Sequence, residues 1–331
     1  MSATTEGPVT WSDTSVLITG GTGSFGNKFV ETMLARHRPR RLCVFSRDEL
    51  KQSEMLARFK DHPSLRFFIG DVRDRERLVR AMHGVDIVFH AAALKQIPAC
   101  EYNPFEAIQT NVLGAKNVID AAIDEGVKRV IGISTDKSVN PINLYGATKL
   151  CAEKLFVQGN VYGRPRGTSF AVVRYGNVIG SRGSVVPLFA AQRASGRVTV
   201  TDREMTRFWI RLEEGVDFAI QSAELMRGGE IFVPKIASMR IMDLVEAVAP
   251  GCAVDDIGIR AGEKLHEILV SEDESRQTLE FDRMFVIEPL DPKWGYRARE
   301  DGKRLARGFR YSSDSNDVWL SPAEMKALCD D

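Results

Sequence analysis

The sequence predicts an α/β protein built on a doubly wound parallel sheet, with a smaller mixed α/β cap. The first observation is an alternation between short apolar runs, rich in β-branched and aromatic residues, and longer stretches whose apolar residues recur every three or four positions. The second is that the short runs are apolar throughout, as strands covered by helices on both faces are. With 331 residues, 44% of them hydrophobic and 27% charged, the chain can form one large domain or a large and a small one.

The expected strands of the first half lie at residues 15–20, 41–46, 65–71, 85–93, 127–135 and 168–178. Crossover helices are expected between them, among them helices within 26–37 and 107–126. After about Gly180 the alternation loosens into the pattern of a mixed cap, interrupted by one return of the chain to the sheet near 211–227. The tail is rich in charge and glycine, so its pattern predicts no fold.

Composition narrows the kind of partner. The 45 basic and 45 acidic residues give a formal net charge of zero, so the chain lacks the positive excess of proteins that bind nucleic acid or anionic membranes. Its apolar runs are too short to span a bilayer and its polar start is no signal peptide, so we expect a cytoplasmic protein with a small-molecule partner. The five cysteines and five histidines show no metal-ligand spacing, and we expect no metal.

Three glycines lie directly after the first expected strand and open the first expected helix: Gly20, Gly23 and Gly26. Glycines there allow a tight turn and let a pyrophosphate approach the backbone, where it binds the free N–H groups of the helix N-terminus. We therefore expect a Rossmann-type dinucleotide site, to which the neighbouring residues Thr22, Ser24 and Phe25 also belong.

The ends of the following strands predict the rest of this site. Ser46 and Arg47 after the second strand suit the 2′-phosphate of NADP, whereas the adjacent Asp48 would suit the ribose of NAD; the pair favours NADP, with NAD as the alternative. Asp71 and Val72 are expected to hold the adenine, although Asp71 also fits a helix N-cap. Small side chains after the fourth strand would let the cofactor approach: Ala91, Ala92 and Ala93.

The stretch from Ser134 to Lys149, STDKSVNPINLYGATK, carries the candidate chemistry. Tyr145 and Lys149 are four residues apart, so they share one face if the segment after Pro141 is helical. A nearby ammonium would pull the tyrosine pKa down from its ordinary value of about 10. Ten residues before the tyrosine, Thr135 is followed by an acid and a base side by side, Asp136 and Lys137.

Together these motifs resemble the extended short-chain dehydrogenase/reductase superfamily over nearly the whole chain. An acid and base directly after the threonine is typical of its sugar-nucleotide 4,6-dehydratases, which have Asp-Glu there. The lysine at position 137, with MTRFWI, GGEIFVPKI and GIRAGEKLHE, resembles the inverting UDP-N-acetylglucosamine 4,6-dehydratases of the pseudaminic acid pathway. The resemblance implies an NADP-dependent lyase that serves surface polysaccharide synthesis and forms a homo-oligomer, with hexamers in the family.

The resemblance also implies roles. Tyr145 is the base for the 4-hydroxyl, Lys149 tunes it and bonds the nicotinamide ribose, and Thr135 binds a substrate hydroxyl. Asp136 is the acid for water loss, and Lys137 is the base at carbon 5. A neutral Lys137 requires a depressed pKa, which burial or the charge of Lys149 could supply.

The UDP-sugar is expected to contact residues that lie mainly in the cap. Guanidinium groups suit a diphosphate, and carboxylates accept from ribose hydroxyls. The expected contacts are Lys95, Thr135, Asn177, Arg207, Arg260 and Glu263. On this basis residues 1–180 form the NADP-binding domain, with the return near 211–227, and residues 181–331 form mainly the nucleotide-sugar cap and the tail.

Two other functions remain open at this point, and so does the choice between N-acetylglucosamine and N-acetylgalactosamine. A dehydratase that also epimerises carbon 5 toward N-acetyl-L-fucosamine shares the acid/base pair, although its tyrosine position can be methionine, whereas Tyr145 is present here. A non-catalytic nucleotide-sugar scaffold would have no need of the whole set of Thr135, Asp136, Lys137, Tyr145 and Lys149.

Overall fold

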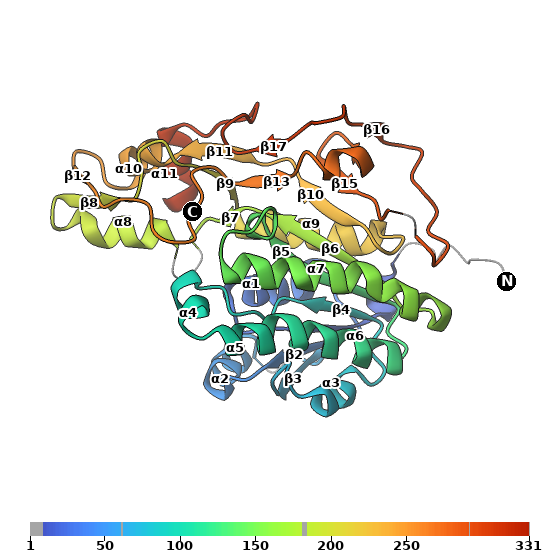
Figure 1. Ribbon diagram of the computed structural model, residues 1–331. Coiled ribbons are helices and arrows are strands. Elements are labelled where there is room, and N and C mark those ends of the chain that lie inside the picture. The colour runs from blue at the N-terminus through green and yellow to red at the C-terminus, as the bar shows by residue number, and fades with distance from the viewer. Residues whose placement is uncertain (1–8, 61, 181–183, 291, 331) are drawn as a thin grey trace.

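A ten-stranded sheet forms the body of the protein in the computed structural model, which describes residues 9–60, 62–180, 184–290 and 292–330 (Figure 1). Seven neighbouring strands run parallel in the order β10-β6-β5-β4-β1-β2-β3. They are β1 (Ser15–Thr19), β2 (Arg41–Ser46), β3 (Leu65–Ile69), β4 (Ile87–His90), β5 (Arg129–Thr135), β6 (Ser169–Tyr175) and β10 (Ile231–Pro234). The strand order reverses between β1 and β4, which is where doubly wound sheets bind their ligands.

Helices cover both faces of this sheet and create two cores. One core lies under α3 (Arg75–Met82), α6 (Gly114–Asp124) and α7 (Leu144–Gly163). The other lies under α1 (Ser24–Thr32), α2 (Glu49–Arg58) and α9 (Leu212–Leu225). The predicted doubly wound sheet with a smaller mixed cap is therefore confirmed.

The second half of the chain contributes more to the sheet than one helix. Besides α9, which lies at the expected return, β10 adds a parallel strand, and three antiparallel strands from the tail extend the edge in the order β16-β14-β15-β10. These are β14 (Thr278–Glu280), β15 (Met284–Ile287) and β16 (Lys303–Arg304). The proposed boundary at 180/181 adjoins residues 181–183, which lie outside the described residues.

The cap projects to one side of the sheet (Figure 1). It has its own apolar core, centred on Phe189, Trp209 and Leu244. Its strands pair as β11-β9-β7, β12-β8 and β13-β17. Its elements are β7 (Asn177–Val178), α8 (Val185–Arg193), β8 (Arg197–Val200), β9 (Thr206–Ile210), β11 (Ala237–Arg240), α10 (Ile241–Val248), β12 (Ala253–Asp256), β13 (Ile268–Val270), β17 (Tyr311–Ser312) and α11 (Pro322–Asp330).

The start of α7 positions the predicted chemistry against the end of β5. Asn143 caps the helix, because its Oδ1 accepts from Gly146 N at 2.7 Å. A short 3-10 turn, η4 (Asp136–Ser138), packs directly on that first helical turn, where a Cβ on Gly146 would lie 2.1 Å from the carbonyl oxygen of Lys137. The glycine therefore lets the Asp-Lys turn lie beside the tyrosine.

Candidate active site

One cavity of ≈ 1180 Å³ runs from the β1–α1 turn to the cap. It is lined by every candidate residue predicted from the sequence except Gly26 and Asp136. Both exceptions are packed behind its wall, since a Cβ on Gly26 would lie 2.3 Å from the carbonyl oxygen of Gly21, and Asp136 is fully buried. The structure thus brings the predicted cofactor, catalytic and substrate residues together in one place.

The pyrophosphate end of the cavity has the shape that a dinucleotide requires. Gly20 has φ +67°, and a Cβ there would lie 2.8 Å from the backbone nitrogen of Ala92. Helix α1 begins at Ser24 with Gly23 as its N-cap, and no side chain caps its first N–H groups. Those donors therefore face the cavity free to bind a phosphate.

Two cations lie at the adenosine end. Arg47 is half exposed and lies 3.5 Å from Asp71, and Lys51, which the sequence analysis missed, also lines the cavity. Asp48 also lines the cavity; it caps α2 by accepting from Lys51 N at 3.0 Å, and its Oδ2 lies 2.6 Å from Lys51 Nζ. Ser46 lines the cavity with its hydroxyl oxygen accepting from Thr22 and Gln52.

Asp71 is not the helix N-cap that the sequence allowed. The cap of α3 is Asp74, whereas Asp71 accepts from the backbone and side chain of Arg73. Burial opposes its ionisation, but the bonds from Arg73 outweigh that cost and hold the pKa of Asp71 below its usual value. The carboxylate is therefore charged and oriented along the wall of the cavity.

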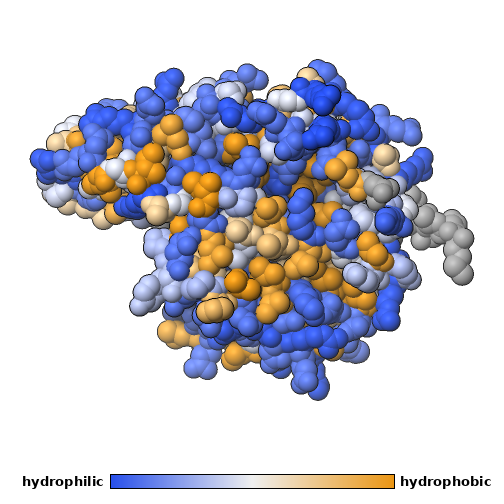
Figure 2. Space-filling view, viewed as in Figure 1, coloured by the Kyte–Doolittle hydropathy of each residue, from blue (hydrophilic) through white to orange (hydrophobic). Residues whose placement is uncertain are grey.

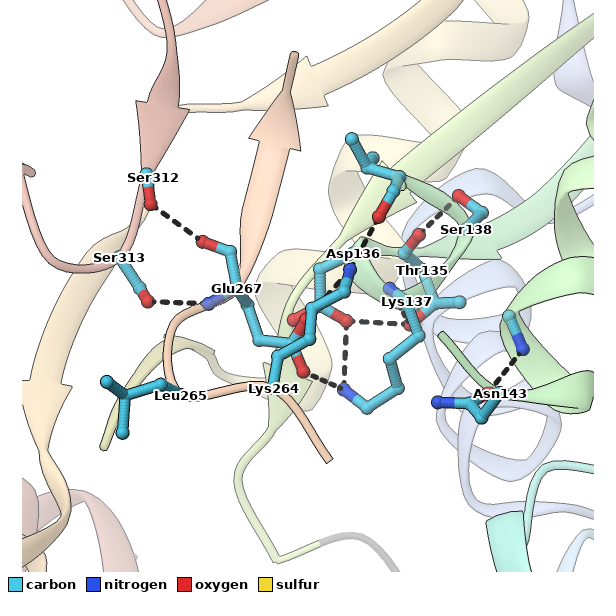
Figure 3. Close-up of polar contacts among 12 residues, drawn as sticks. Thr135, Asp136, Lys137, Ser138, Asn143, Lys264, Leu265, Glu267, Ser312 and Ser313 are labelled. Atoms are coloured by element: carbon cyan, nitrogen blue, oxygen red, sulfur yellow. Dashed lines mark hydrogen bonds and ion pairs between the residues drawn. The ribbon is translucent and has the colours of Figure 1, made fainter. Parts of the chain in front are cut away.

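The predicted catalytic turn, residues 135–138 at the end of β5, is a compact hydrogen-bonded unit (Figure 3). Thr135 Oγ1 donates to Asp136 Oδ1 at 2.8 Å, and Lys137 Nζ donates to the same oxygen at 2.9 Å. A third contact fixes the lysine, because its Nζ also donates to Asn177 Oδ1 at 3.0 Å. Asn177, predicted as a diphosphate contact, thus holds Lys137 with its side chain.

The predicted depressed pKa of Lys137 is wrong for this structure. Burial alone lowers the pKa of Lys137, but the carboxylates of Asp136 and Glu267 outweigh it and raise the pKa above its ordinary value. Glu267 was not singled out from the sequence; its Oε1 lies 3.7 Å from Lys137 Nζ. Lys137 is therefore an ammonium flanked by two acids.

The tuning of Tyr145 also differs from the expectation. Burial raises the pKa of Tyr145 to about 12, and the lysine that opposes this shift is Lys137, helped by a hydrogen bond with Thr135. Lys149 instead donates to the carbonyl oxygen of Ile133 at 2.7 Å. Burial lowers the pKa of Lys149 itself to about 8, against the opposing charge of Glu153.

The predicted substrate residues differ in how their side chains are bonded within the protein. Arg207 lines the cavity, but its guanidinium donates to the carbonyl oxygens of residues 206, 264 and 265, so it shapes the loop beside the catalytic turn. Arg260 is half exposed and 3.8 Å from Glu263, and both line the cavity. Lys95 also lines it, and burial, with a smaller contribution from Lys137, lowers its pKa.

Two further findings bear on the classes of function. No helix among the described residues is long and apolar enough to cross a membrane. Within the same residues, His, Cys, Asp and Glu side chains form no group of three or more that could hold a metal ion.

The fold and the cavity define a dinucleotide-binding protein of the extended short-chain dehydrogenase/reductase type, as recognised from the sequence. Residues 16–289 match the family model described as polysaccharide biosynthesis protein, and the chain belongs to that family.

Relatives agree with this membership. The chain is 52% identical, over 94% of its length and 96% of the relative's, to the UDP-N-acetylglucosamine 4,6-dehydratase (inverting) of Campylobacter jejuni serotype O:2. It is 46% identical to the UDP-glucose 4-epimerase of Rickettsia typhi, over 96% and 95% of the two chains. Among solved structures, Pen from Bacillus thuringiensis has a TM-score of 0.88 at 38% identity, covering 97% of this chain and 98% of that one.

Proposed function

We propose that this protein is a UDP-N-acetylglucosamine 4,6-dehydratase that inverts carbon 5. Its product is UDP-2-acetamido-2,6-dideoxy-β-L-arabino-hex-4-ulose, an intermediate for pseudaminic acid and other surface glycans. The observation that carries the proposal is the Asp136–Lys137 pair, bonded at 2.9 Å at the end of β5 beside Tyr145. The 52% identity to the Campylobacter dehydratase over nearly the whole chain supports it.

The residues of this chain supply four proton transfers. Tyr145 takes the proton of the 4-hydroxyl, with Thr135 holding that hydroxyl. Once carbon 4 is a ketone, the proton on carbon 5 is acidic, and Lys137 removes it as a neutral amine. Asp136 protonates the departing 6-hydroxyl, which leaves as water. A proton returned to carbon 5 from the face opposite Lys137 then gives inversion, and Tyr145 is the candidate donor.

The cavity fits a nicotinamide dinucleotide. Gly20 and Ala92 adjoin at the point where the strand order reverses, and the uncapped start of α1 faces the same space. A nicotinamide held by these residues would supply hydride transfer from carbon 4 to carbon 6, with no net consumption of cofactor. We favour NADP because Arg47 and Lys51 face the adenosine end while Asp48 is engaged as a helix cap.

The UDP end of the substrate lies toward the cap in this proposal. Arg260 and Glu263 line the cavity there and are suited to the diphosphate and the ribose hydroxyls. Lys95, whose pKa is lowered partly by Lys137, is close enough to the catalytic turn to reach the sugar. Arg207 acts indirectly, by holding the loop that carries Lys264 and Leu265.

We also propose a homo-oligomer. Helices α4 (Ile97–Tyr102), α5 (Pro104–Ile108) and α6 pack alongside α7, and this part of the chain exposes several large apolar side chains. They are Tyr102, Phe105, Ile108, Leu113, Val161 and Tyr162. Apolar side chains also gather over α6 and α7 in Figure 2. The cytoplasmic location predicted from the sequence stays a prediction.

The chemistry of the acid/base pair also distinguishes this proposal from two alternative functions. A 4-epimerase, the name given to the Rickettsia protein, changes only carbon 4, so it needs no acid for a 6-hydroxyl and no base at carbon 5. A scaffold needs no proton carriers at all. Loss of water from carbon 6 is therefore the reaction that distinguishes the candidates.

An NMR time course with UDP-N-acetylglucosamine and a catalytic amount of NADP tests the proposal. We expect a 6-deoxy-4-keto sugar with no requirement for NADPH, and no product from Lys137→Ala, which keeps UDP binding. UDP-N-acetylgalactosamine as the product would instead indicate a 4-epimerase. Binding without turnover would indicate a scaffold, and normal turnover by Lys137→Ala would reject its role as base.

A further inference from the structure

Glu267 is a buried acid beside Lys137, and its Oε2 has no hydrogen-bond partner in the part of the chain that the structure describes. It lies at the end of the loop that joins β12 to β13, and its side chain is 4% exposed. Its backbone is fixed by Ser313, the residue after β17, because Ser313 N donates to its carbonyl oxygen at 2.8 Å and its own N–H donates to Ser313 Oγ at 3.0 Å. Figure 3 shows the carboxylate directed at Lys137.

The charged groups around Glu267 come from three elements. Lys137 and Asp136 belong to η4, Arg207 to β9, and Lys264 to the same loop as Glu267. Its Oε1 is 3.7 Å from Lys137 Nζ, and its Oε2 is 3.7 Å from Lys264 Nζ. Lys264 already donates to the carbonyl oxygen of Val139. Among the described residues, neither Glu267 Oε2 nor Asp136 Oδ2 has a hydrogen-bond partner.

The protons that the site residues must lose or gain before the proposed dehydratase reaction indicate a function for Glu267. This inference rests on that proposed reaction. Two groups must lose a proton before chemistry starts, since Tyr145 must accept from the 4-hydroxyl and Lys137 must accept from carbon 5. Asp136 must gain one to protonate the leaving group. Tyr145 is hydrogen-bonded to Thr135, which donates to Asp136, so the tyrosine proton has a path to Asp136. The proton of Lys137 then needs a second acceptor.

We propose that Glu267 takes the proton that Lys137 must release to become the carbon 5 base. One N–H bond of Lys137 breaks and one O–H bond forms on Glu267, while one O–H bond of Tyr145 breaks and one forms on Asp136 through Thr135. The summed charge of the cluster is unchanged. Lys137 must move about 1 Å to close the present gap to a hydrogen bond, which its flexible stem allows.

The environment of Glu267 supports this role. Burial, followed by the repulsion from Asp136, raises the pKa of Glu267, while Lys137, Arg207 and Lys264 oppose that rise. A neutral Glu267 also avoids a buried carboxylate whose Oε2 has no hydrogen-bond partner among the described residues. Glu267 is thus a catalytic proton acceptor. The cap places it beside Lys137, the base that lies at the end of β5.

The test compares Glu267→Gln with Glu288→Gln, a buried glutamate outside the cavity that accepts from Tyr296 and Arg299. We expect Glu267→Gln to lower kcat by about 100-fold or more with little change in KM, and Glu288→Gln to keep wild-type turnover. Because the lysine proton can then leave only to solvent, the rate of Glu267→Gln should climb with pH over a range where the wild-type rate is flat.

A different result overturns the inference. If Glu267 only stabilises the ammonium of Lys137, its removal eases the loss of that proton, and Glu267→Gln will match or exceed the wild type at neutral pH. The wild-type assay alone decides the proposed dehydratase function, whereas the ratio of the variant to the wild type decides the role of Glu267.

Infrared spectroscopy covers the case in which Glu267→Gln does not fold. Asp136→Asn with bound UDP-N-acetylglucosamine holds the cluster before water loss and removes the other acid that could be protonated. We expect a band from a buried protonated carboxyl group that moves in heavy water and shifts again in Glu267→Asp. Absence of that band in Asp136→Asn would overturn the inference.

Discussion

Lys149 donates to the carbonyl oxygen of Ile133, with 2.7 Å between its Nζ and that oxygen. The lysine is therefore tied to β5, the strand that ends in the catalytic turn. Burial lowers its pKa to about 8, so the folded protein holds an ammonium at neutral pH at a cost in stability.

We predict that Lys149→Met stabilises the protein at neutral pH while abolishing turnover. The gain in the free energy of unfolding should be up to about 3 kcal/mol, because the variant removes a lysine whose pKa burial lowers from 10.5 to about 8. Between pH 8 and 10.5 the unfolded wild type binds a proton that the folded state has lost, so wild-type stability rises relative to the variant. Urea unfolding across this range measures the difference; a gap that does not change with pH would contradict the prediction.

Arg174 is fully buried and pairs with one buried acid, Glu153, and one partly exposed acid, Glu274, and this cluster supports the catalytic turn. Its Nη2 lies 2.6 Å from Glu153 and 2.9 Å from Glu274. Glu153 in turn accepts from Ser134 and Ser138, on either side of Thr135, Asp136 and Lys137. The Arg174–Glu153 ion pair therefore holds the turn in place through the two serines that flank it.

Arg174→Met should destabilise the fold by about 3–5 kcal/mol, since it leaves buried carboxylates without a counter-charge. Denaturant titration measures this loss. Arg197→Met is the matched control, because Arg197 forms an exposed pair with Asp255. Equal unfolding midpoints for the two variants would show that the Arg174 cluster stabilises the fold no more than the exposed pair of Arg197 and Asp255 does.

Gly20→Ala should abolish dinucleotide binding. The added Cβ would meet the backbone of Ala92 at 2.8 Å, on a residue with φ +67°. Gly167→Ala is the control: Gly167 also has a positive φ, +82°, but nothing lies within 4 Å of the added Cβ. Calorimetry should show wild-type cofactor affinity for Gly167→Ala, and wild-type affinity for Gly20→Ala would refute the proposed pyrophosphate site.

Arg47→Ala should weaken NADP about tenfold or more and leave NAD affinity unchanged, because only NADP carries the 2′-phosphate. Arg58→Ala serves as the control, since Arg58 is exposed, pairs with Glu31 and does not line the cavity. Titration of each cofactor by calorimetry into the unmodified protein and the two variants gives the six affinities. Equal affinity of the unmodified protein for NADP and NAD would remove the basis of the assignment.

The sequence predicted the parts of the site that depend on local spacing. Tyr145 and Lys149 are four residues apart on α7, and the Asp-Lys pair follows a strand, so one helix and one strand end suffice to place them. Glu267 could not be found in this way. It lies 130 positions after Lys137, and the packing of the cap against η4 brings them together.

The contrast between local spacing and contacts of distant segments also explains where the pKa shifts and the edge of the sheet differ from the sequence-based expectations. The signs of the Lys137 and Tyr145 shifts depend on burial and on neighbours from distant elements, which spacing does not reveal. Strands β14 and β16 are three and two residues long, too short for a hydrophobic pattern, so their place in the main sheet follows from pairing with β15 rather than from their composition.

In the proposed reaction, Lys137 removes the carbon 5 proton from one face of the ring before water loss, and a proton returns to the opposite face after it, with Tyr145 as the candidate donor. Running the reaction in heavy water, stopping it before spontaneous scrambling and reading the ring couplings by NMR tests this claim most directly. The account predicts an early product of the L-arabino configuration with one solvent deuterium at carbon 5. An early product of the D-xylo configuration would contradict it.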